Sequence, residues 1–331
     1  MDQPRHSWDR PIHNSQFTNH NFFDRWILER RGSRNPVDSS RAVAAFVEPE
    51  RTERGEIADV ATLFLTNREC PWRCLMCDLW KNTTTETVPA GAIPAQIRRS
   101  LAVLLPTRRI KLYNSGSFFD RGAIPPADHG EIAGLLKGFE RVIVESHPAL
   151  VEESCRSFRN LLEGDLEVAL GLETVHPSVL ERLNKRMTVA DFRRAAERLR
   201  SDGIAMRAFV LLGIPFVSRE ESLFWACRSV EEAFDAGATA VSVIPTRTGN
   251  GAMDELERRG EFSPPSLAAL EQVSEFGVGL ARGRVFVDLW EISRLRRCAE
   301  CFTARVERLR SQNLIQQVAP RAPCDACGAG S

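Results

Sequence analysis

Six short apolar runs alternate with amphipathic stretches over much of the chain. Several runs are apolar almost throughout, which is typical of parallel strands that are buried on both faces. The alternation predicts six βα units, arranged as an α/β barrel or a doubly wound sheet, and a standard closed barrel needs eight. Chemistry is then expected at the C-terminal ends of the strands. The runs are VATLFLT (60–66), RIKLYN (109–114), RVIVES (141–146), LEVALGLE (166–173), AMRAFVLL (205–212) and ATAVSVI (238–244).

Two of the stretches between these runs carry the signals of a helix start. Thr188 can cap TVADFRRAAERLRSDG, with Asp191 in its first turn and Gly203 placed to end the helix. Ser218 and Glu221 form the capping-box pattern at the head of SREESLFWACRSVEEAF. Apolar residues share one face in the first of these stretches, so it predicts an amphipathic helix.

The composition divides the chain into three parts. Residues 1–55 are an N-terminal extension without sustained periodicity, in which FFDRWILERR predicts one helix on the main body and RRGSRNPVDSSR predicts a loop. Residues 56–290 are the core, where RVFVDLWEI (284–292) is a candidate for one more strand. Residues 291–331 are a tail with four cysteines. The predicted architecture is a partial (β/α)6 TIM-type barrel with an N-terminal extension and a small C-terminal four-cysteine module.

Charge and hydropathy narrow the classes of function. The formal net charge of the 331 residues is zero, so no overall basic field indicates nucleic acid. No run of 18 apolar residues exists and the polar N-terminus lacks the apolar core of a signal peptide. We therefore expect a cytoplasmic protein without membrane contact, whose nine cysteines are reduced thiols or metal ligands rather than disulfides.

Three of these cysteines, Cys70, Cys74 and Cys77, lie within eight residues directly after the first predicted strand. The spacing C-x3-C-x2-C suits a short loop around one corner of an iron–sulfur cube, in which each thiolate takes one iron and the fourth iron stays open. An open coordination position distinguishes a reactive metal site from a closed structural one. The alternatives are unrelated buried cysteines or part of a zinc site, but no fourth Cys or His lies close by in the sequence.

This loop, after the first strand of six βα units, resembles that of the radical S-adenosylmethionine (SAM) superfamily. The resemblance implies an enzyme with a [4Fe–4S] cluster on Cys70, Cys74 and Cys77. A SAM molecule would bind the open iron and be cleaved reductively to a 5′-deoxyadenosyl radical, which abstracts hydrogen from the substrate. A reductant such as flavodoxin or ferredoxin is then a partner.

The resemblance also implies residues that bind SAM. Met76 stands where an aromatic residue usually lies near the adenine. Ser115, Gly116 and Ser117 match, in position, the small-residue motif whose backbone meets the amino group of SAM, although the common form is Gly-Gly-Glu. An ordinary strand-to-helix turn is the alternative interpretation of this second motif.

The resemblance implies three more SAM-binding residues, which lie further along the chain. Glu173, at the end of the fourth run, would approach the ribose or amino end of SAM. Arg186, in NKRMT, would meet its carboxylate, and Ile244 would touch the adenine. Glu173 and Arg186 could instead form a surface pair.

The motifs CPWRCLMCDLW, KLYNSGSFFD and GLETVHPSVLERLNKRMT resemble the Elongator catalytic-subunit-like branch in particular. Within it they look closest to the radical SAM subunits of archaeosine synthases, which remodel a deazaguanine base in tRNA. This implies tRNA as substrate and a partner protein that supplies a modified base. A small-molecule or peptide substrate, and a non-catalytic iron–sulfur or zinc subunit, are the alternatives.

The tail cysteines form two C-x2-C pairs, Cys298 with Cys301 and Cys324 with Cys327, separated by 22 residues. Such pairs predict a tetrahedral zinc site, with an auxiliary iron–sulfur cluster as the alternative. The intervening segment, 302–323, carries four arginines against one acid and could contact RNA phosphates or form a plain solvated helix.

Overall fold

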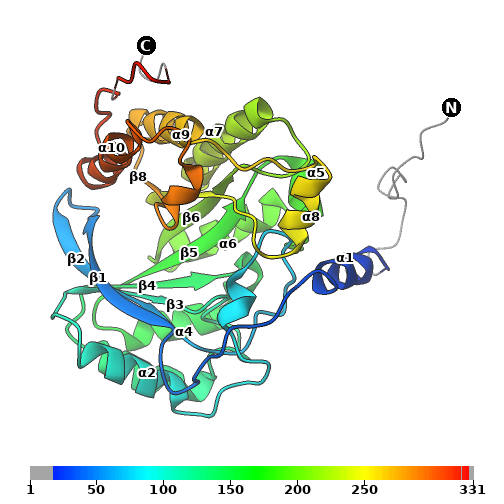
Figure 1. Cartoon of the computed structure of the whole chain (residues 1–331). Helices are drawn as coiled ribbons and strands as arrows, with labels where there is room; N and C mark the ends of the chain where they lie inside the picture. Colours follow the sequence, from blue (N-terminus) through cyan, green and yellow to red (C-terminus); the bar gives the residue numbers. More distant parts are fainter. Residues whose placement is uncertain (1–17, 322, 328–331) are drawn as a thin grey trace.

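The computed structural model describes residues 18–321 and 323–327. Its eight strands form one sheet in the order of the sequence, with β1 antiparallel to β2 and every later neighbour parallel. The sheet curls into a half-barrel whose two edges are β1 and β8 (Figure 1). The strands are β1 (Ala44–Arg51), β2 (Ile57–Phe64), β3 (Arg109–Tyr113), β4 (Arg141–Ser146), β5 (Asp165–Glu173), β6 (Ala205–Leu212), β7 (Ala240–Pro245) and β8 (Arg284–Val287).

Helices follow the parallel strands and lie around the sheet (Figure 1). They enclose the main apolar core, which lies between them and the sheet. No helix in the described ranges is long and apolar enough to cross a membrane. The helices are α1 (Thr18–Leu28), α2 (Ala92–Leu101), α3 (His129–Leu135), α4 (Glu153–Leu161), α5 (Pro177–Arg182), α6 (Val189–Ser201), α7 (Arg219–Asp235), α8 (Ala252–Arg258), α9 (Leu267–Gly279) and α10 (Phe302–Ile315), with 3₁₀ turns η1 (Leu79–Asn82), η2 (Pro126–Asp128), η3 (Pro148–Leu150) and η4 (Ile292–Leu295).

The predicted partial barrel is confirmed: the six apolar runs are β2 to β7, and the candidate segment 284–292 contains β8. Both predicted capping boxes are present at the starts of α6 and α7. The expected N-terminal helix is α1, whose Trp26 and Ile27 join an apolar cluster with Leu75 of the cysteine loop. The sequence analysis missed β1, and residues 1–17 of the extension lie outside the described residues.

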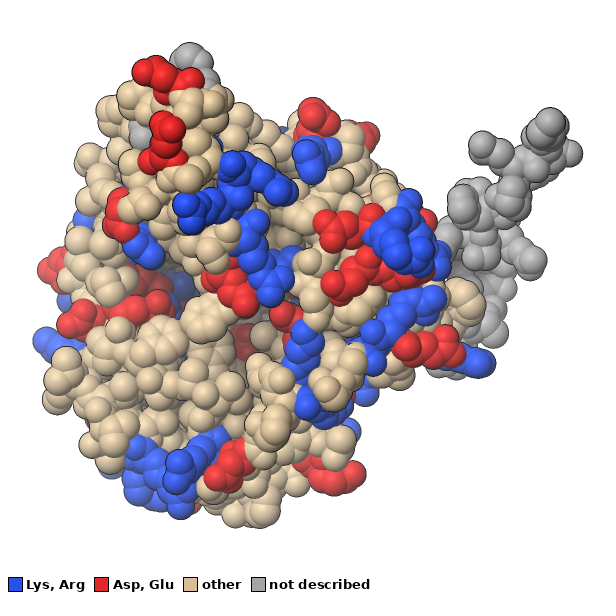
Figure 2. Space-filling model, viewed as in Figure 1, with Lys and Arg blue, Asp and Glu red and all other residues tan. Residues whose placement is uncertain are grey.

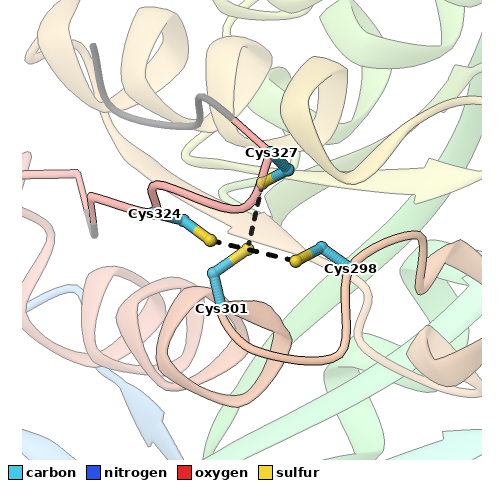
Figure 3. A group of neighbouring side chains, drawn as sticks. All are labelled: Cys298, Cys301, Cys324 and Cys327. Carbon is cyan, nitrogen blue, oxygen red and sulfur yellow. Dashed lines mark hydrogen bonds between the residues drawn. The ribbon is translucent and has the colours of Figure 1, made fainter.

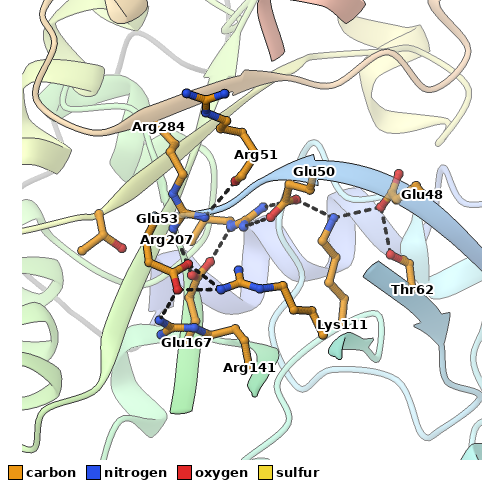
Figure 4. A network of polar contacts seen from close by, with 12 residues as sticks. Glu48, Glu50, Arg51, Glu53, Thr62, Lys111, Arg141, Glu167, Arg207 and Arg284 are labelled. Atoms are coloured by element: carbon orange, nitrogen blue, oxygen red, sulfur yellow. Dashed lines mark hydrogen bonds and ion pairs between the residues drawn. The ribbon is translucent and has the colours of Figure 1, made fainter. Parts of the chain in front are cut away.

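The interior of the half-barrel is filled by charged side chains (Figure 4). Glu50 of β1 pairs with Lys111 of β3 at 2.7 Å and with Arg207 of β6 at 2.6 Å. Glu167 of β5 accepts from Arg207 at 2.8 Å and from Arg284 of β8 at 3.2 Å. Because four of the parallel strands and β1 contribute to this network, it ties opposite sides of the sheet together.

Helix α10 covers the sheet edge formed by β8. The Asn313 side chain accepts from the Val287 N–H and donates to the Val287 carbonyl, both at 2.9 Å. Gln316 accepts from the Val285 N–H at 2.7 Å and donates to its carbonyl at 2.9 Å. Two side-chain amides therefore satisfy backbone groups that a further strand would otherwise pair, which removes an exposed edge. The same helix also packs against β1, the other edge.

Candidate functional site

Cys70, Cys74 and Cys77 lie in the loop after β2, at the C-terminal edge of the sheet, as the sequence predicts. All three are free thiols. Burial raises the pKa of each thiol to about 12, and each is also affected by the charge of another of the three. The loop therefore holds three half-buried thiols in surroundings that oppose a free thiolate and favour one bound to a metal cation.

Two asparagines that the sequence analysis missed hold this loop in place. Asn250, after β7, donates to the carbonyls of Leu75 at 2.8 Å and Cys77 at 3.2 Å. Asn184, after α5, donates to the Arg73 carbonyl at 2.8 Å. The loop has no regular structure of its own, so its carbonyls need such side-chain donors. Nothing in the local sequence pattern connects Asn250 to a loop 173 positions earlier.

The predicted motif after β3 packs directly on the cysteine loop. A Cβ added to Gly116 would lie 3.1 Å from the Cβ of Cys70, tighter than ordinary van der Waals contact, so glycine suits this close approach. Ser115 has a left-handed backbone with φ of 55°. Glu145 of β4 accepts from the N–H of Asn114 at 2.6 Å and of Gly116 at 3.3 Å, which fixes the motif above the strand ends.

Trp72, in the cysteine loop, stacks on His147 at the end of β4, with ring centroids 3.9 Å apart. The backbone N–H of His147 donates to Ser117 Oγ at 2.7 Å. The ring Nε2 of His147 lies 2.9 Å from the Lys185 carbonyl. The Ala149 N–H donates to Nδ1, which places the ring proton on Nε2. Burial lowers the pKa of His147 to about 3, so the ring is neutral and joins three segments of the site.

The predicted acid Glu173 is buried at the end of β5 and pairs with Lys185 Nζ at 2.5 Å. Gly171 makes room for this pair, since a Cβ there would lie 2.2 Å from Glu173 Oε1. Arg186 instead pairs with Asp24 of α1 at 2.5 Å, with 32% of its side chain exposed. The alternative of a surface pair between Glu173 and Arg186 is therefore wrong: the first is buried and its cation is the neighbouring lysine.

The two predicted adenine neighbours lie in one apolar region. Met76 and Ile244, both partly buried, pack against the cluster that contains Leu75, Leu211 and Ile214. This cluster is separate from the main core and lies on the side of the cysteine loop that faces α1 and α8. An apolar wall beside three thiols suits a flat heterocycle.

The residues present fit a cluster with bound SAM. The donor set is three thiols and no fourth ligand from the same loop, and glycine keeps the neighbouring loop close. Two buried polar groups at the same edge of the sheet have no partner among the described residues: the Asn114 side-chain amide and the Thr246 hydroxyl. Buried polar atoms normally have partners, so these groups are available to a polar ligand bound at this edge.

The four tail cysteines come together as predicted (Figure 3). Their Sγ atoms all lie within 4.8 Å of one another, with Cys298 and Cys324 at 3.8 Å and Cys301 and Cys327 at 3.6 Å. Backbone N–H groups of Cys301 and Glu300 donate to Cys298 Sγ and lower its pKa to about 7. The group can therefore hold a metal.

The four arginines between the two cysteine pairs do not form a free basic face. Arg305 pairs with Glu271 of α9 at 2.6 Å, and Arg308 and Arg321 both pair with Glu275 at 2.7 Å. Arg310 pairs with Glu307 within α10. Three of these cations fasten α10 and the tail to α9, and the fourth is paired within α10, so the structure does not favour the suggested contact of this segment with RNA.

A basic rim follows β8 instead, and we use that name for Trp290, Arg294, Arg296 and Arg297. All four side chains are exposed, and Trp290 is 63% exposed. Figure 2 shows Lys and Arg gathered over this segment, which Figure 1 draws in orange, with a hollow in the surface beside it. Arg294 donates to the Thr248 carbonyl at 3.1 Å, and Lys81 of η1 donates to the carbonyl of the next residue, Gly249. Arg294 of the rim and Lys81, which follows the cysteine loop, therefore bind neighbouring carbonyls.

A parallel half-barrel with a C-x3-C-x2-C loop after its first parallel strand makes the chain similar to radical SAM proteins. Solved structures similar to it include Elp3 of Methanocaldococcus infernus with an N-terminal deletion, at 16% identity and a TM-score of 0.47, covering 67% of this chain and 58% of that one. Methylornithine synthase is 11% identical with a TM-score of 0.48, covering 82% and 71%. Coproporphyrinogen III oxidase of Escherichia coli, described as a radical SAM enzyme, is 12% identical with a TM-score of 0.44, covering 83% and 56%.

Sequence comparison leads to particular relatives. Archaeosine synthase subunit beta of Methanosarcina acetivorans is 26% identical over 225 residues, 64% of this chain and 65% of that protein. Its namesake from Thermococcus kodakarensis is 29% identical over 171 residues, 50% and 52%. The protein MJ0550 of Methanocaldococcus jannaschii is 23% identical over 278 residues, 78% and 76%. The chain thus spans less than two thirds of the two archaeosine synthase subunits. No protein-family model matches. The predicted resemblance to subunits of archaeosine synthases is therefore confirmed.

Proposed function

We propose that the chain is a radical SAM enzyme that acts on a modified nucleobase in tRNA. The observation that carries the proposal is the packing of Gly116 on Cys70, which brings the motif after β3 against a loop of three half-buried thiols. A [4Fe–4S] cluster with bound SAM would supply reductive carbon–sulfur cleavage and a 5′-deoxyadenosyl radical there. Reduced flavodoxin or ferredoxin would be the electron donor.

The residues of the chain have distinct tasks in this proposal. Cys70, Cys74 and Cys77 hold the cluster and leave one iron for SAM. The backbone of Ser115, Gly116 and Ser117 meets the amino end of SAM, and the orphaned amide of Asn114 lies beside it.

The remaining predicted residues bind the rest of SAM. Met76 and Ile244 form the apolar wall for the adenine. Glu173 approaches the ribose, and Lys185 Nζ donates a hydrogen bond to that carboxylate at 2.5 Å. Arg186, engaged with Asp24, reaches the SAM carboxylate only by leaving that partner. Burial of the site excludes water from a reactive radical.

The basic rim supports an RNA substrate. An exposed tryptophan can stack on an unpaired base, and arginines can contact phosphates. Three arginines gather at the C-terminal end of β8, and this is the edge of the sheet that carries the cysteine loop. The two relatives named archaeosine synthase subunit beta suggest a tRNA base and a partner subunit.

An anaerobic assay tests the proposal. The chain is reconstituted with iron and sulfide, reduced with dithionite, given SAM, and 5′-deoxyadenosine is measured with and without bulk tRNA. We expect product that rises with tRNA. Product indifferent to tRNA would redirect the proposal to a small molecule or peptide. Absence of product from a fully loaded cluster, with tRNA and the partner subunit present, would indicate a non-catalytic subunit.

Charge reversal at the rim tests the RNA contact separately. Arg296→Glu with Arg297→Glu should weaken tRNA binding and its salt dependence, while SAM cleavage without tRNA stays unchanged. Arg200→Glu is the control. This exposed arginine lies at the end of α6, near the N-terminal ends of the strands and away from the cysteine loop. Equal binding by the rim variant and the control would remove the rim from the proposal.

A further inference from the structure

The sulfur spacing in the tail distinguishes between the two metal centres that the sequence left open. Four thiolates around one zinc ion at about 2.3 Å form a tetrahedron with edges of about 3.8 Å. The two measured separations are 3.8 and 3.6 Å, and all four sulfurs lie within 4.8 Å of one another. In a four-iron cube each thiolate binds a different iron, so its sulfurs stand much farther apart. The geometry fits one ion and not a cube.

The groups around the four sulfurs suit the negative charge of a zinc–thiolate site. Zinc with four thiolates carries a net charge of −2. Arg305 donates to the Cys301 sulfur and pairs with Glu271 of α9 at 2.6 Å. Backbone N–H groups of Glu300 and Cys301 donate to the Cys298 sulfur. These contacts orient the ligands and offset their charge, as the outer partners of metal ligands do.

The site lies at the start of the helix that covers the sheet edge. Cys301 immediately precedes α10, and the last turn of that helix and the residue after it supply Asn313 and Gln316 to the backbone of β8. Cys324 and Cys327 come from the segment after the helix, so an ion would join both of its flanks. Arg308 and Arg321 hold the tail as far as residue 321 through Glu275. Beyond them Cys324 is half-buried and Cys327 exposed, so the ion would fix this last part.

We propose that the tail binds one closed, tetrahedral Zn²⁺ ion whose role is to fix α10 over the open β8 edge of the half-barrel. This inference does not depend on the proposed radical chemistry, because all four positions of the ion are filled by protein. The rim between β8 and Cys298 is then held at both ends, by the strand and by the ion. The metal would thereby set the shape of the barrel mouth without touching the reaction.

Metal analysis of the full chain tests the site itself. Protein purified without added iron should contain one zinc per chain, and Cys324→Ser with Cys327→Ser should lose it. Cys227→Ser, at a thiol of α7 outside both sites, should keep it. Substituted Co²⁺ should give the intense visible bands of tetrahedral thiolate coordination. One iron in place of zinc, several irons with sulfide in the Cys74→Ala protein, or no metal would each overturn the assignment.

Hydrogen exchange tests the role of the ion. The amides of Val285 and Val287 are protected by Gln316 and Asn313, so zinc removal by a chelator should speed their exchange by about tenfold or more, as local opening does. Amides of β4 in the middle of the sheet serve as the internal control, which also reveals global unfolding. Asn313→Ala with Gln316→Ala should show the same faster exchange with zinc retained. Zinc loss that leaves both amides protected would overturn the role.

Discussion

The two cysteine sites of the chain differ in ligand number, burial and support. The loop presents three thiols beside buried polar groups without partners, and burial raises the pKa of these thiols to about 12. The tail presents four thiols that range from the buried Cys301 to the exposed Cys327, and backbone N–H groups lower the pKa of Cys298 to about 7. The tail can supply all four ligands of a metal ion, whereas the loop leaves one coordination position that another molecule must fill. Each prediction below tests one side of this difference.

Removing one loop ligand should separate the sites most clearly. In Cys74→Ala the loop can no longer hold a cube, so iron loading and 5′-deoxyadenosine formation should both be abolished. The tail zinc should remain at one per chain, because no tail ligand changes. Iron and zinc analysis together with product assay checks this, with Cys227→Ala as control. Substantial activity in the variant would mean that the loop is not the reactive site.

Lys185→Met should be the most destabilising change near the loop. It leaves Glu173 buried without its cation, and breaking a buried pair in this way costs about 3–5 kcal/mol in free energy of unfolding. Arg186→Met is the matched control, since its pair with Asp24 is partly exposed and is worth about 1 kcal/mol or less. Urea unfolding measures both, and equal losses would contradict the burial difference between neighbouring cations.

Gly116→Ala should weaken the loop site by a smaller amount. The new methyl group would lie 3.1 Å from the Cβ of Cys70 and push the two loops apart. We expect about a tenfold loss in SAM cleavage, the scale of changes that disturb metal ligands from outside. Gly130→Ala, in α3 with nothing within 4 Å, is the control. Equal activities would show that the motif after β3 does not set the position of Cys70.

A further effect should appear only in acid. Burial lowers the pKa of His147 to about 3 in the folded protein, below its ordinary value of 6.5. Its contribution to stability is therefore present above pH 6.5 and is lost as the pH falls toward 3, with a slope of at most about 1.4 kcal/mol per pH unit. His147→Phe keeps an aromatic ring against Trp72 and should flatten this slope. Denaturant unfolding at several pH values would refute the prediction if both slopes agree.

The sequence predicts the parallel strands because several of them are apolar almost throughout, but the same rule hides β1. Its inward side chains, Glu48 and Glu50, face Lys111 and Arg207 rather than an apolar core. A strand that carries Glu, Pro and Arg does not match the pattern of a buried strand. Its role depends on charges from β3 and β6, which no local pattern reveals.

The loop cysteines and their neighbours at Ser115–Ser117 could be located from spacing and strand order alone. The partner of Glu173 could not, because the segment that bears Lys185 and Arg186 is irregular. Asn184 and Arg186 both have left-handed backbones, with φ of 55° and 57°, so side-chain direction there follows no period. Buried polar orphans such as Asn114 also depend on tertiary structure, since only packing shows that water is excluded.

The charged interior has a consequence for how the chain reaches its native state. Glu50 and Arg207 meet across 157 positions of sequence. Glu50 can therefore reach this partner only after most of the sheet has been translated. Contacts of such long range slow folding, because loop closure must precede them. The ion pair that joins the first strand to the sixth therefore forms only when the sheet is nearly complete.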